Sequence, residues 1–438
     1  MKKNSGPALW QHAKSIIPGG SQLLSKRSEQ FLPDLWPSYY SRAQGVQVWD
    51  LDGNPYTDMC ITGIGACPLG YADPDVDRAV VEAIGRGSMC TLNCPEEVEL
   101  AETLLRLHPW AGMVRYARGG GEAMAIAIRI ARAFTGKDRI AFCGYHGWHD
   151  WYLAANLADD RNLDGHLLPG LAPRGVPRAL TGTALPFRYN NLEDLDDIAR
   201  RYKGEIAAVV MEPVRDHEPD EGFLEGAAQV AQDLGALLII DEVSAGYRLT
   251  TGGAHLLYGL QPDIAVFAKA MSNGYPMAAV IGQEDPMQAA QETFISSTYW
   301  TERIGPTAAI ATIRKYQQNN VPDHLVRAGR LVQRGWQKAA DNAALPIEIA
   351  GISPLAHFSF DIAEGAAAQT LFSQLMLERG FLAGKSFYAT FAHTDAHIGE
   401  YTAACEEVFR TIADAESGGT ILQMLKGPVA HAGFRRLT

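Results

Sequence analysis

Short apolar runs alternate with amphipathic helical segments along the middle of the chain. The most distinct apolar runs lie at 112–117, 139–143, 206–211, 236–241 and 263–268. Segments with helical periodicity occupy most of the intervals between them, at 122–136, 192–202 and 224–235. Continuously apolar runs that alternate with helices are typical of a mostly parallel sheet buried on both faces. We therefore predict an α/β domain in this part of the chain.

The two ends of the chain have a different pattern. A helical segment at 9–17 precedes a Pro-Gly-Gly break, and "GVQVWDLDGNPYTDM" at 45–59 predicts a β-hairpin, because alternating apolar positions flank a DLDGN turn. From about residue 304 onward, further helical segments and an apolar run at 355–362 predict a second, smaller α+β lobe. The expected segments are 1–72, 73–310 for the large domain, and 311–438.

Composition and charge exclude several functional classes. The 438 residues have a net charge of -12, with 47% hydrophobic and 20% charged residues, which is ordinary for a globular enzyme and argues against nucleic-acid binding. No apolar run reaches the length of a membrane helix. Residues 1–20 begin with two lysines but lack a continuous apolar core, so we expect a mature cytoplasmic protein without a signal peptide.

The cysteines and histidines do not indicate a metal site. Cys90 and Cys94 lie four positions apart, but neither a second cysteine pair nor a histidine pair at zinc spacing accompanies them. The two histidines of "GYHGWHDW" at 144–151 also lack an evident third ligand. We expect reduced thiols and no metal.

Chemically distinctive residues follow each of the five apolar runs. In chain order these are "RGGGE" at 118–122, "GYHGWH" at 144–149, Glu212, Asp241 and Lys269. Ligands of open parallel sheets bind outside the carboxyl ends of the strands. If the five runs are neighbouring strands, these residues meet at one crevice.

Each of these features also has a purely structural explanation. The glycine-rich turn either binds an anion at a helix N-terminus or is a flexible connection. It lacks the glycine spacing of a dinucleotide site. The aromatic residues at 144–151 either stack on a planar ligand or fill the core, and Asp241 and Glu212 either serve a ligand or form structural caps and salt bridges.

Lys269 is the hardest residue to explain structurally. An ammonium at the end of an apolar strand loses hydration and is costly. In a desolvated pocket its pKa falls, and the amine becomes a nucleophile that forms Schiff bases. A Schiff-base lysine, an acid 28 positions before it (269 − 241), an anion-binding turn and a stacking aromatic together predict a pyridoxal phosphate (PLP) site, in which the acid holds the pyridine nitrogen protonated.

The sequence also resembles a known family over nearly its whole length. It is similar to class III PLP-dependent aminotransferases, and among them to the glutamate-1-semialdehyde aminomutase-like group. The motifs that support the resemblance are "IIPGG" (16–20), "VWDLDGNPYTDM" (48–59), "LGYADPDVDRAV" (69–80), "GGGEAMAIAIRIARAFTGKDRI" (119–140), "GYHGWHDW" (144–151), "MEPV" (211–214), "DEVSAGYR" (241–248) and "PDIAVFAKAMSNGYPMAAVIG" (262–282). The resemblance implies a fold-type I enzyme, in which a large PLP-binding domain with a mostly parallel seven-stranded sheet is joined by a small α+β domain built from both termini. It also implies a homodimer with shared active sites.

The resemblance implies a role for individual residues. Lys269 is expected to hold PLP as a Schiff base, and Asp241 to pair with the pyridine nitrogen. Val243 and Tyr145 are expected on opposite faces of the ring. The remaining expected cofactor contacts are the backbone N–H groups of Gly120 and Gly121 at the phosphate, His146 beside Tyr145, Glu212 near the cofactor hydroxyl, and Thr298 at the phosphate of the neighbouring subunit.

The chain departs from the family pattern in three places. Where the family has Asn-Ser-Gly-Thr-Glu-Ala, this chain has "RGGGEA", so Arg118 adds a charge that we expect to face the crevice. Where the aminomutases have a carboxylate-binding arginine after "PGG", the segment here contains Lys26 and Arg27. The loop after Thr298 also has an extra "YWTER", which we expect to shape a different pocket.

These features predict an aminotransferase that uses a small-molecule amino donor and a polar, for example sugar-like, carbonyl acceptor. An intramolecular aminomutase would use the same residues without a separate donor. A racemase or decarboxylase on the same fold is a further alternative, and a non-catalytic binding or regulatory protein is an alternative of another class. The presence of Lys269 argues against the last of these.

Overall fold

The computed structural model describes residues 4–166 and 169–431, and these form two compact units. One unit combines Met1–Asp73 with Asp323–Thr438, and the other is Pro74–Pro322. The second unit extends beyond residue 310, the limit expected from the sequence, because α9 (Ile304–Asn319) packs against α2 (Pro74–Gly85) and α3 (Pro95–Leu107).

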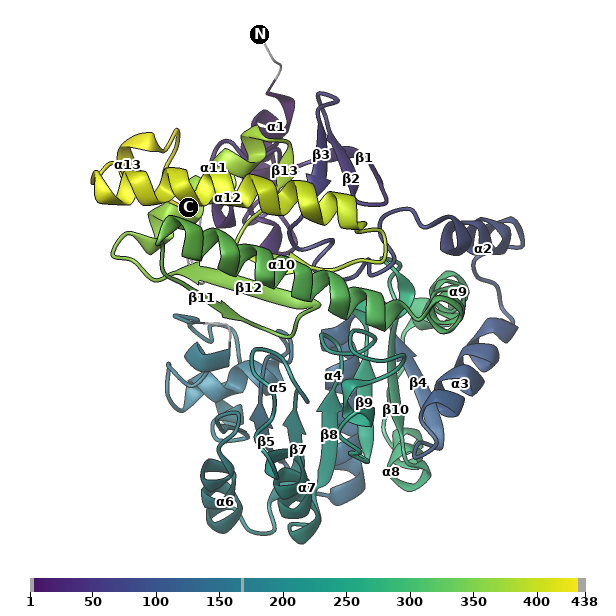
Figure 1. The fold of residues 1–438 in the computed structure, drawn as a ribbon. Helices are drawn as coiled ribbons and strands as arrows, with labels where there is room; N and C mark the ends of the chain where they lie inside the picture. The colour runs from purple at the N-terminus through teal and green to yellow at the C-terminus, as the bar shows by residue number, and fades with distance from the viewer. Residues whose placement is uncertain (1–3, 167–168, 432–438) are drawn as a thin grey trace. The chain divides into compact units, whose positions relative to one another are not determined.

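The Pro74–Pro322 unit is built on a seven-stranded sheet (Figure 1). Its spatial order is β4 (Met113–Ala117), β10 (Ala278–Gly282), β9 (Ile264–Phe267), β8 (Leu237–Asp241), β7 (Ile206–Met211), β5 (Arg139–Cys143) and β6 (Ala184–Pro186). Strand β10 is antiparallel to both of its neighbours, and the other pairs are parallel. The predicted mostly parallel α/β sheet is therefore confirmed.

The sheet is buried on both faces. Alternate residues of the strands enter two separate cores: Val210 and Ile239 pack in the core that contains α4 (Gly120–Thr135), whereas Val209 and Ile240 pack in the one that contains α7 (Phe223–Asp233). Figure 1 shows these two helices on opposite faces. Helix α6 (Leu192–Arg201) packs against α7. Two covered faces explain why the strands are apolar at nearly every position.

In its described residues, the unit formed by the two ends of the chain contains a four-stranded sheet and a three-stranded sheet. The predicted hairpin is β2 (Gln47–Asp50) and β3 (Pro55–Asp58), which lie in a sheet of order β1-β2-β3-β13. Within it, β13 (Phe381–Leu382) pairs in parallel with β3 and so joins the two ends of the chain. The first strand of that sheet is β1 (Tyr40–Gln44), and the second sheet is β11 (Ile347–Ala350), β12 (Leu355–Phe360) and β14 (Ser386–Tyr388).

Helices complete this unit and supply its core. They are α1 (Ser5–Ile16), α10 (Val321–Ala343), α11 (Gly365–Glu378), α12 (Asp395–Ser417) and α13 (Ile421–Met424). Trp336, Phe358, Phe372 and Phe409 are fully buried, and the ring of Phe358 contacts the other three. This aromatic cluster joins elements of the C-terminal half into one core.

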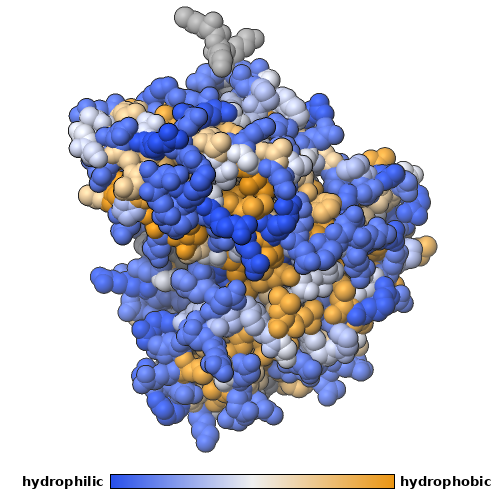
Figure 2. All heavy atoms as spheres, in the orientation of Figure 1, coloured by the Kyte–Doolittle hydropathy of each residue, from blue (hydrophilic) through white to orange (hydrophobic). Residues whose placement is uncertain are grey.

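Most of the surface in view is hydrophilic, and its hydrophobic atoms lie in separate patches (Figure 2). In the described part of the chain, no helix has both the length and the apolar character needed to cross a membrane.

Candidate functional site

Asp241 and His146 form a buried pair at the carboxyl ends of two parallel strands, β8 and β5, which lie on either side of β7. Asp241 is the last residue of β8, and His146 follows β5 by three positions. The Nδ1 atom of His146 lies 2.7 Å from Oδ2 of Asp241, and its Nε2 lies 3.2 Å from the carbonyl oxygen of Cys143. Both ring nitrogens of His146 therefore face oxygen atoms, which fixes the orientation of the imidazole beside Asp241.

The glycine-rich turn forms the N-terminus of α4. The carboxylate of Glu122 accepts hydrogen bonds from the backbone N–H groups of Arg118 and Gly119, both at 3.1 Å. The following N–H groups, of Gly120 and Gly121, begin the helix and therefore have no acceptor within it. With the positive end of the helix dipole, they make a site suited to a phosphate.

Close packing explains why position 120 is a glycine. A Cβ atom there would lie 2.8 Å from Cγ1 of Val243. The backbone N–H of Val243 in turn donates to Oδ1 of Asp241 at 2.9 Å. The N-terminus of α4 therefore lies against Val243, and Val243 lies against Asp241.

Glu212 connects the ends of β5 and β7. Its Oε2 accepts a hydrogen bond from the backbone N–H of Tyr145 at 3.0 Å and pairs with Nη1 of Arg215 at 3.1 Å. Gly144 has φ 118°, and a Cβ atom there would lie 2.7 Å from the same carboxylate oxygen. Glycine at 144 thus permits both the left-handed turn and the close approach of Glu212.

Lys269 lies two positions after the end of β9 and has an unusual backbone conformation. Its φ is 43°, in the left-handed region that non-glycine residues seldom occupy and that is often found at functional sites. Its Nζ donates to Oγ of Ser244 at 2.8 Å. Burial lowers the pKa of Lys269 from 10.5 to about 8, with a further lowering by Arg215 and an opposing effect of Glu212.

Arg118 does not place its charge in the crevice, contrary to the expectation from the sequence. Its Nε forms an ion pair with Oε1 of Glu302 at 2.8 Å, and its Nη2 donates to the carbonyl oxygens of Trp300 and Glu302, both at 3.0 Å. The guanidinium is therefore directed to the segment after Thr298. Thr298 itself is exposed, at the start of a 3₁₀ turn (Thr298–Thr301).

Comparison with known proteins identifies the family. A family model described as class III aminotransferase matches residues 33–406. The chain belongs to the class III aminotransferases. It is 30% identical to the 3-aminobutyryl-CoA aminotransferase of Cloacimonas acidaminovorans, over 91% of this chain and 95% of that protein. It is also 33% identical to the glutamate-1-semialdehyde 2,1-aminomutase of Roseiflexus castenholzii, over 96% of this chain and 100% of the relative.

Solved structures of PLP-dependent enzymes share the fold of this aminotransferase. The FumI protein of Sphingopyxis sp. MTA144, in a PLP form, has a TM-score of 0.85 at 23% identity, covering 95% of this chain and 98% of that one. A transaminase with PLP bound has a TM-score of 0.84 at 24% identity, covering 95% of this chain and 100% of the other. The predicted fold is therefore confirmed.

The described residues fit PLP chemically. A class III aminotransferase needs a reactive amine, an acid for the ring nitrogen and donors for the phosphate. Lys269 has the lowered pKa of a reactive amine, and Asp241 is buried and bonded to His146. The first N–H groups of α4 are available as phosphate donors, and the glycine at position 120 is required there because a side chain would contact Val243. Within residues 4–166 and 169–431, no group of three or more His, Cys, Asp or Glu side chains is placed to hold a metal ion.

Sequence reasoning missed three polar residues of this aminotransferase that act on Lys269. Ser244 accepts its hydrogen bond, and the guanidinium groups of Arg215 and Arg248 lower its pKa electrostatically. All three belong to or directly follow motifs that the sequence analysis quoted, "MEPV" and "DEVSAGYR". The available signal was that each lies within seven positions of Glu212 or Asp241 in the sequence. The sequence alone does not show whether such a side chain faces Lys269 or the solvent.

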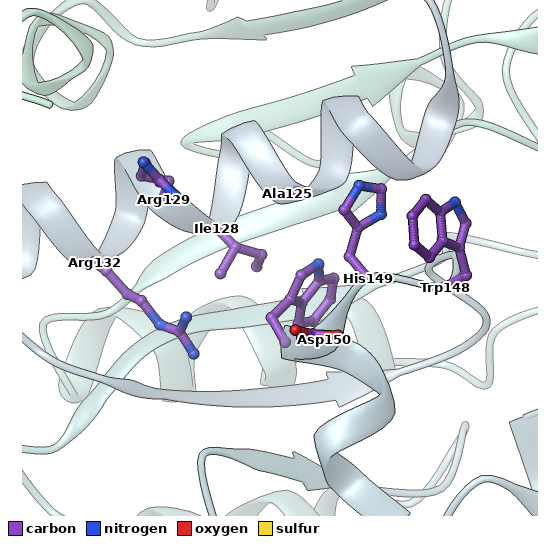
Figure 3. Close-up of a pocket in the computed structure, with 8 residues that line it drawn as sticks. Ala125, Ile128, Arg129, Arg132, Trp148, His149 and Asp150 are labelled. Carbon is purple, nitrogen blue, oxygen red and sulfur yellow. The ribbon is translucent and has the colours of Figure 1, made fainter. Parts of the chain in front are cut away.

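A groove of about 430 Å³ lies beside α4 (Figure 3). Its lining includes Arg129, Arg132, Trp148, His149 and Asp150. Neither Lys269 nor Asp241 lines it. The groove approaches the N-terminus of α4 through His149. A Cβ atom added to Gly121 would lie 3.1 Å from Nδ1 of His149.

Proposed function

We propose that this class III aminotransferase moves an amino group from a small-molecule donor to a polar, for example sugar-like, carbonyl acceptor by means of Lys269. The observation that supports this proposal is the Lys269 amine, whose pKa is lowered to about 8, in the same set of strand ends as the Asp241–His146 pair. A general acid–base group works best when its pKa lies near the working pH. Lys269 would thus accept and return a proton at the substrate carbon near neutral pH.

Each residue at the strand ends would bind a different part of the cofactor. When bound, PLP would supply a ring that withdraws electrons from the reacting carbon. Asp241, held in place by His146, would pair with the ring nitrogen. Val243 and Tyr145 would lie on the two ring faces, and the N–H groups of Gly120 and Gly121 would bind the phosphate.

Glu212 would lie near the cofactor hydroxyl and would influence the pKa of Lys269. Its carboxylate raises the pKa of Lys269, whereas its partner Arg215 lowers it. The backbone N–H of Tyr145 binds the same carboxylate oxygen as Arg215. Glu212 would therefore fix the loop that positions Tyr145 and balance the charge around the amine.

The acceptor is proposed from the departures of this chain from the aminomutase pattern. The segment after "PGG" contains Lys26 and Arg27, and a lysine does not replace the planar, bidentate guanidinium that binds a carboxylate. A relative from Streptomyces kanamyceticus, 33% identical over 84% of this chain and 91% of its own length, is named 2'-deamino-2'-hydroxyneamine transaminase. That name favours a hydroxylated acceptor.

Intramolecular amino transfer is the second candidate, because four of the relatives are named glutamate-1-semialdehyde 2,1-aminomutase. An aminomutase turns over its substrate without a separate amino donor. Turnover by protein freed of donor would favour the aminomutase, whereas strict dependence on an added donor would favour the transaminase. Product analysis in the same assay would detect racemisation or decarboxylation instead.

We also propose a homodimer in which Thr298 contributes to the neighbouring subunit's phosphate site. Thr298 is exposed, and the side chains of Tyr299 and Phe294 in the same segment are 70% and 85% exposed. Large exposed aromatic side chains on one segment favour a protein contact.

The visible spectrum of the purified protein tests the central proposal. We expect an absorbance band of lysine-bound cofactor that bleaches when the correct amino donor is added, and that is lost in Lys269→Ala. Lys137→Ala is the matched control, since the ammonium of Lys137 binds only the carbonyls of Leu234 and Gly235 in the described structure. A band that survives Lys269→Ala unchanged, or no band in wild-type protein supplied with PLP, would favour a non-catalytic protein.

A further inference from the structure

Arg118 connects two segments that are far apart in the sequence. It lies two positions before α4, whose first N–H groups form the proposed phosphate site. Its Nη1 donates to the carbonyl oxygen of Ala117 at 3.0 Å, so the guanidinium is fixed to the end of β4. From there its Nε and Nη2 reach Glu302 and the carbonyl of Trp300.

Glu302 in turn holds the start of α9. Its Oε1 accepts a hydrogen bond from the backbone N–H of Gly305 at 3.0 Å, and its other oxygen accepts from Ile304. A Cβ atom at Gly305 would lie 2.9 Å from the same Oε1. A single carboxylate therefore satisfies N–H groups at the N-terminus of α9 and the charge of Arg118.

Two further arginines bind the segment that precedes Glu302. Nη2 of Arg115, in β4, donates to the carbonyl oxygen of Ile295 at 2.6 Å, and Nη1 of Arg129, in α4, donates to that of Phe294 at 3.3 Å. Segment 294–302 contains no strand, and its one regular element is the turn Thr298–Thr301. Arginine side chains therefore supply bonds that a sheet would otherwise supply.

We propose that Arg118 is a positioning residue that couples PLP retention to dimer formation. It would hold the turn at the phosphate site and the segment that contains Thr298 in one fixed arrangement. The segment would then need little ordering when a second subunit or the phosphate binds, and preorganisation of this kind increases affinity. This inference rests on the proposed function, in which Thr298 serves the neighbouring subunit.

The chemistry of arginine is suited to this role. A planar guanidinium can pair with a carboxylate and donate to two carbonyl oxygens at once, whereas a lysine ammonium is a point charge on a flexible chain. The side chains of Arg118 and Glu302 are only 12% and 17% exposed, so water competes little with the ion pair. Glycines at 119–121 leave no side chain that could replace these contacts.

The test compares Arg118→Ala, Arg118→Lys and Glu302→Gln with wild type. Arg139→Ala is the matched control, because Nε of Arg139 pairs with Glu205 at 2.8 Å and its Nη1 donates to the carbonyl of Gly182, at the opposite end of its strand from the site. Each full-length protein is loaded with PLP and diluted into PLP-free buffer. Visible absorbance then gives the release rate, sedimentation gives the dimer dissociation constant, and circular dichroism gives the folded fraction.

We expect Arg118→Ala to release PLP about tenfold faster and to dimerise more weakly while remaining folded, as expected for a lost preorganising contact. Arg118→Lys and Glu302→Gln should lie between wild type and Arg118→Ala, and Arg139→Ala should match wild type. An Arg118→Ala protein that releases PLP and dimerises like Arg139→Ala overturns the inference. So does an Arg118→Lys protein identical to wild type, since charge alone would then suffice.

Failure of the proposed function gives a different result. A wild-type protein that binds no PLP contradicts both the function and the coupling. If the wild-type protein binds PLP normally and Arg118→Ala releases PLP at the wild-type rate, only the proposed coupling is contradicted.

Discussion

The imidazole of His146 and the carboxylate of Asp241 are in contact, with 2.7 Å between Nδ1 and Oδ2, and both residues are at most 2% exposed. The pair joins the ends of two parallel strands, β5 and β8, that are separated in the sheet by β7. A carboxyl group in such a place needs a hydrogen-bonding partner. His146 therefore fixes the position of the carboxylate that we propose pairs with the ring nitrogen of PLP.

We expect His146→Phe to lower the free energy of unfolding by about 3 kcal/mol, because it leaves a buried carboxylate without its partner. The pH dependence of the visible spectrum of the bound cofactor should shift as well. His108→Phe is the control: its ring is also fully buried, and it bonds only the carbonyl of Leu104 in the described structure. Denaturant unfolding and pH titration of absorbance measure both effects. An equal spectral shift in the two variants would contradict the role of the pair.

Lys269 should make the apoprotein more stable as the pH rises from about 8 to 10.5. Its folded pKa is lowered to about 8, so between these values the unfolded chain binds more protons than the folded one, and the free energy of unfolding increases with pH. Below pH 8 the charged amine costs roughly 3 kcal/mol, from about 1.4 kcal/mol for each pKa unit. Lys269→Met should therefore exceed wild-type stability at pH 7, and the difference should shrink as the pH rises to 10.5.

Lys338→Met is the control for this comparison, since the Lys338 side chain is 66% exposed and pairs with Glu406 at the surface. Its stability difference from wild type should not change over the same pH range. Urea unfolding of the apoproteins at several pH values measures both differences. A Lys269→Met difference that is constant with pH would show that the amine is not desolvated.

Glu212 and Arg215 should shift the pKa of Lys269 in opposite directions. Glu212 raises this pKa, so Glu212→Gln should lower it further, and Arg215 lowers it, so Arg215→Gln should raise it. Only the neutral amine reacts with an amine-specific reagent, and the pH dependence of labelling at Lys269, followed by mass spectrometry, reports the pKa. Shifts of the same sign in both variants would contradict the charge arrangement described for this site.

Gly120→Ala should weaken PLP binding through a steric contact with Val243. The new Cβ atom would lie 2.8 Å from Cγ1 and 3.1 Å from Cγ2 of Val243, and overpacking of this kind costs about 1–3 kcal/mol. The double variant Gly120→Ala/Val243→Ala should recover much of the lost stability. Gly85→Ala, where nothing lies within 4 Å, should be neutral or slightly stabilising. Thermal unfolding and PLP titration distinguish these results, and no recovery in the double variant would mean that Val243 is not the obstacle.

The sequence predicted most of the sheet but not all of it. The five apolar runs became β4, β5, β7, β8 and β9, because strands buried on both faces must be continuously apolar. Strand β6 has only three residues, too few for a periodic signal. Strand β10 was missed although its sequence, "AAVIG", is apolar, because it follows the turn after Lys269 and returns antiparallel, which a strand–helix alternation does not predict.

For the candidate site, the sequence by itself determined the chemical inventory: an amine, two acids, glycines and an aromatic at strand ends, in motifs specific enough to identify the family. The identity of these residues is local information, and the carboxyl ends of parallel strands bring them together.

Only the tertiary structure decided how the groups pair. His146 binds Asp241 from 95 residues away, and Arg118 binds the carbonyl of Glu302 from 184 residues away, so no sequence period relates the partners. The charge of Arg118 was expected in the crevice, but a buried guanidinium must find a carboxylate and carbonyl acceptors, and only the folded chain places Glu302 within its reach.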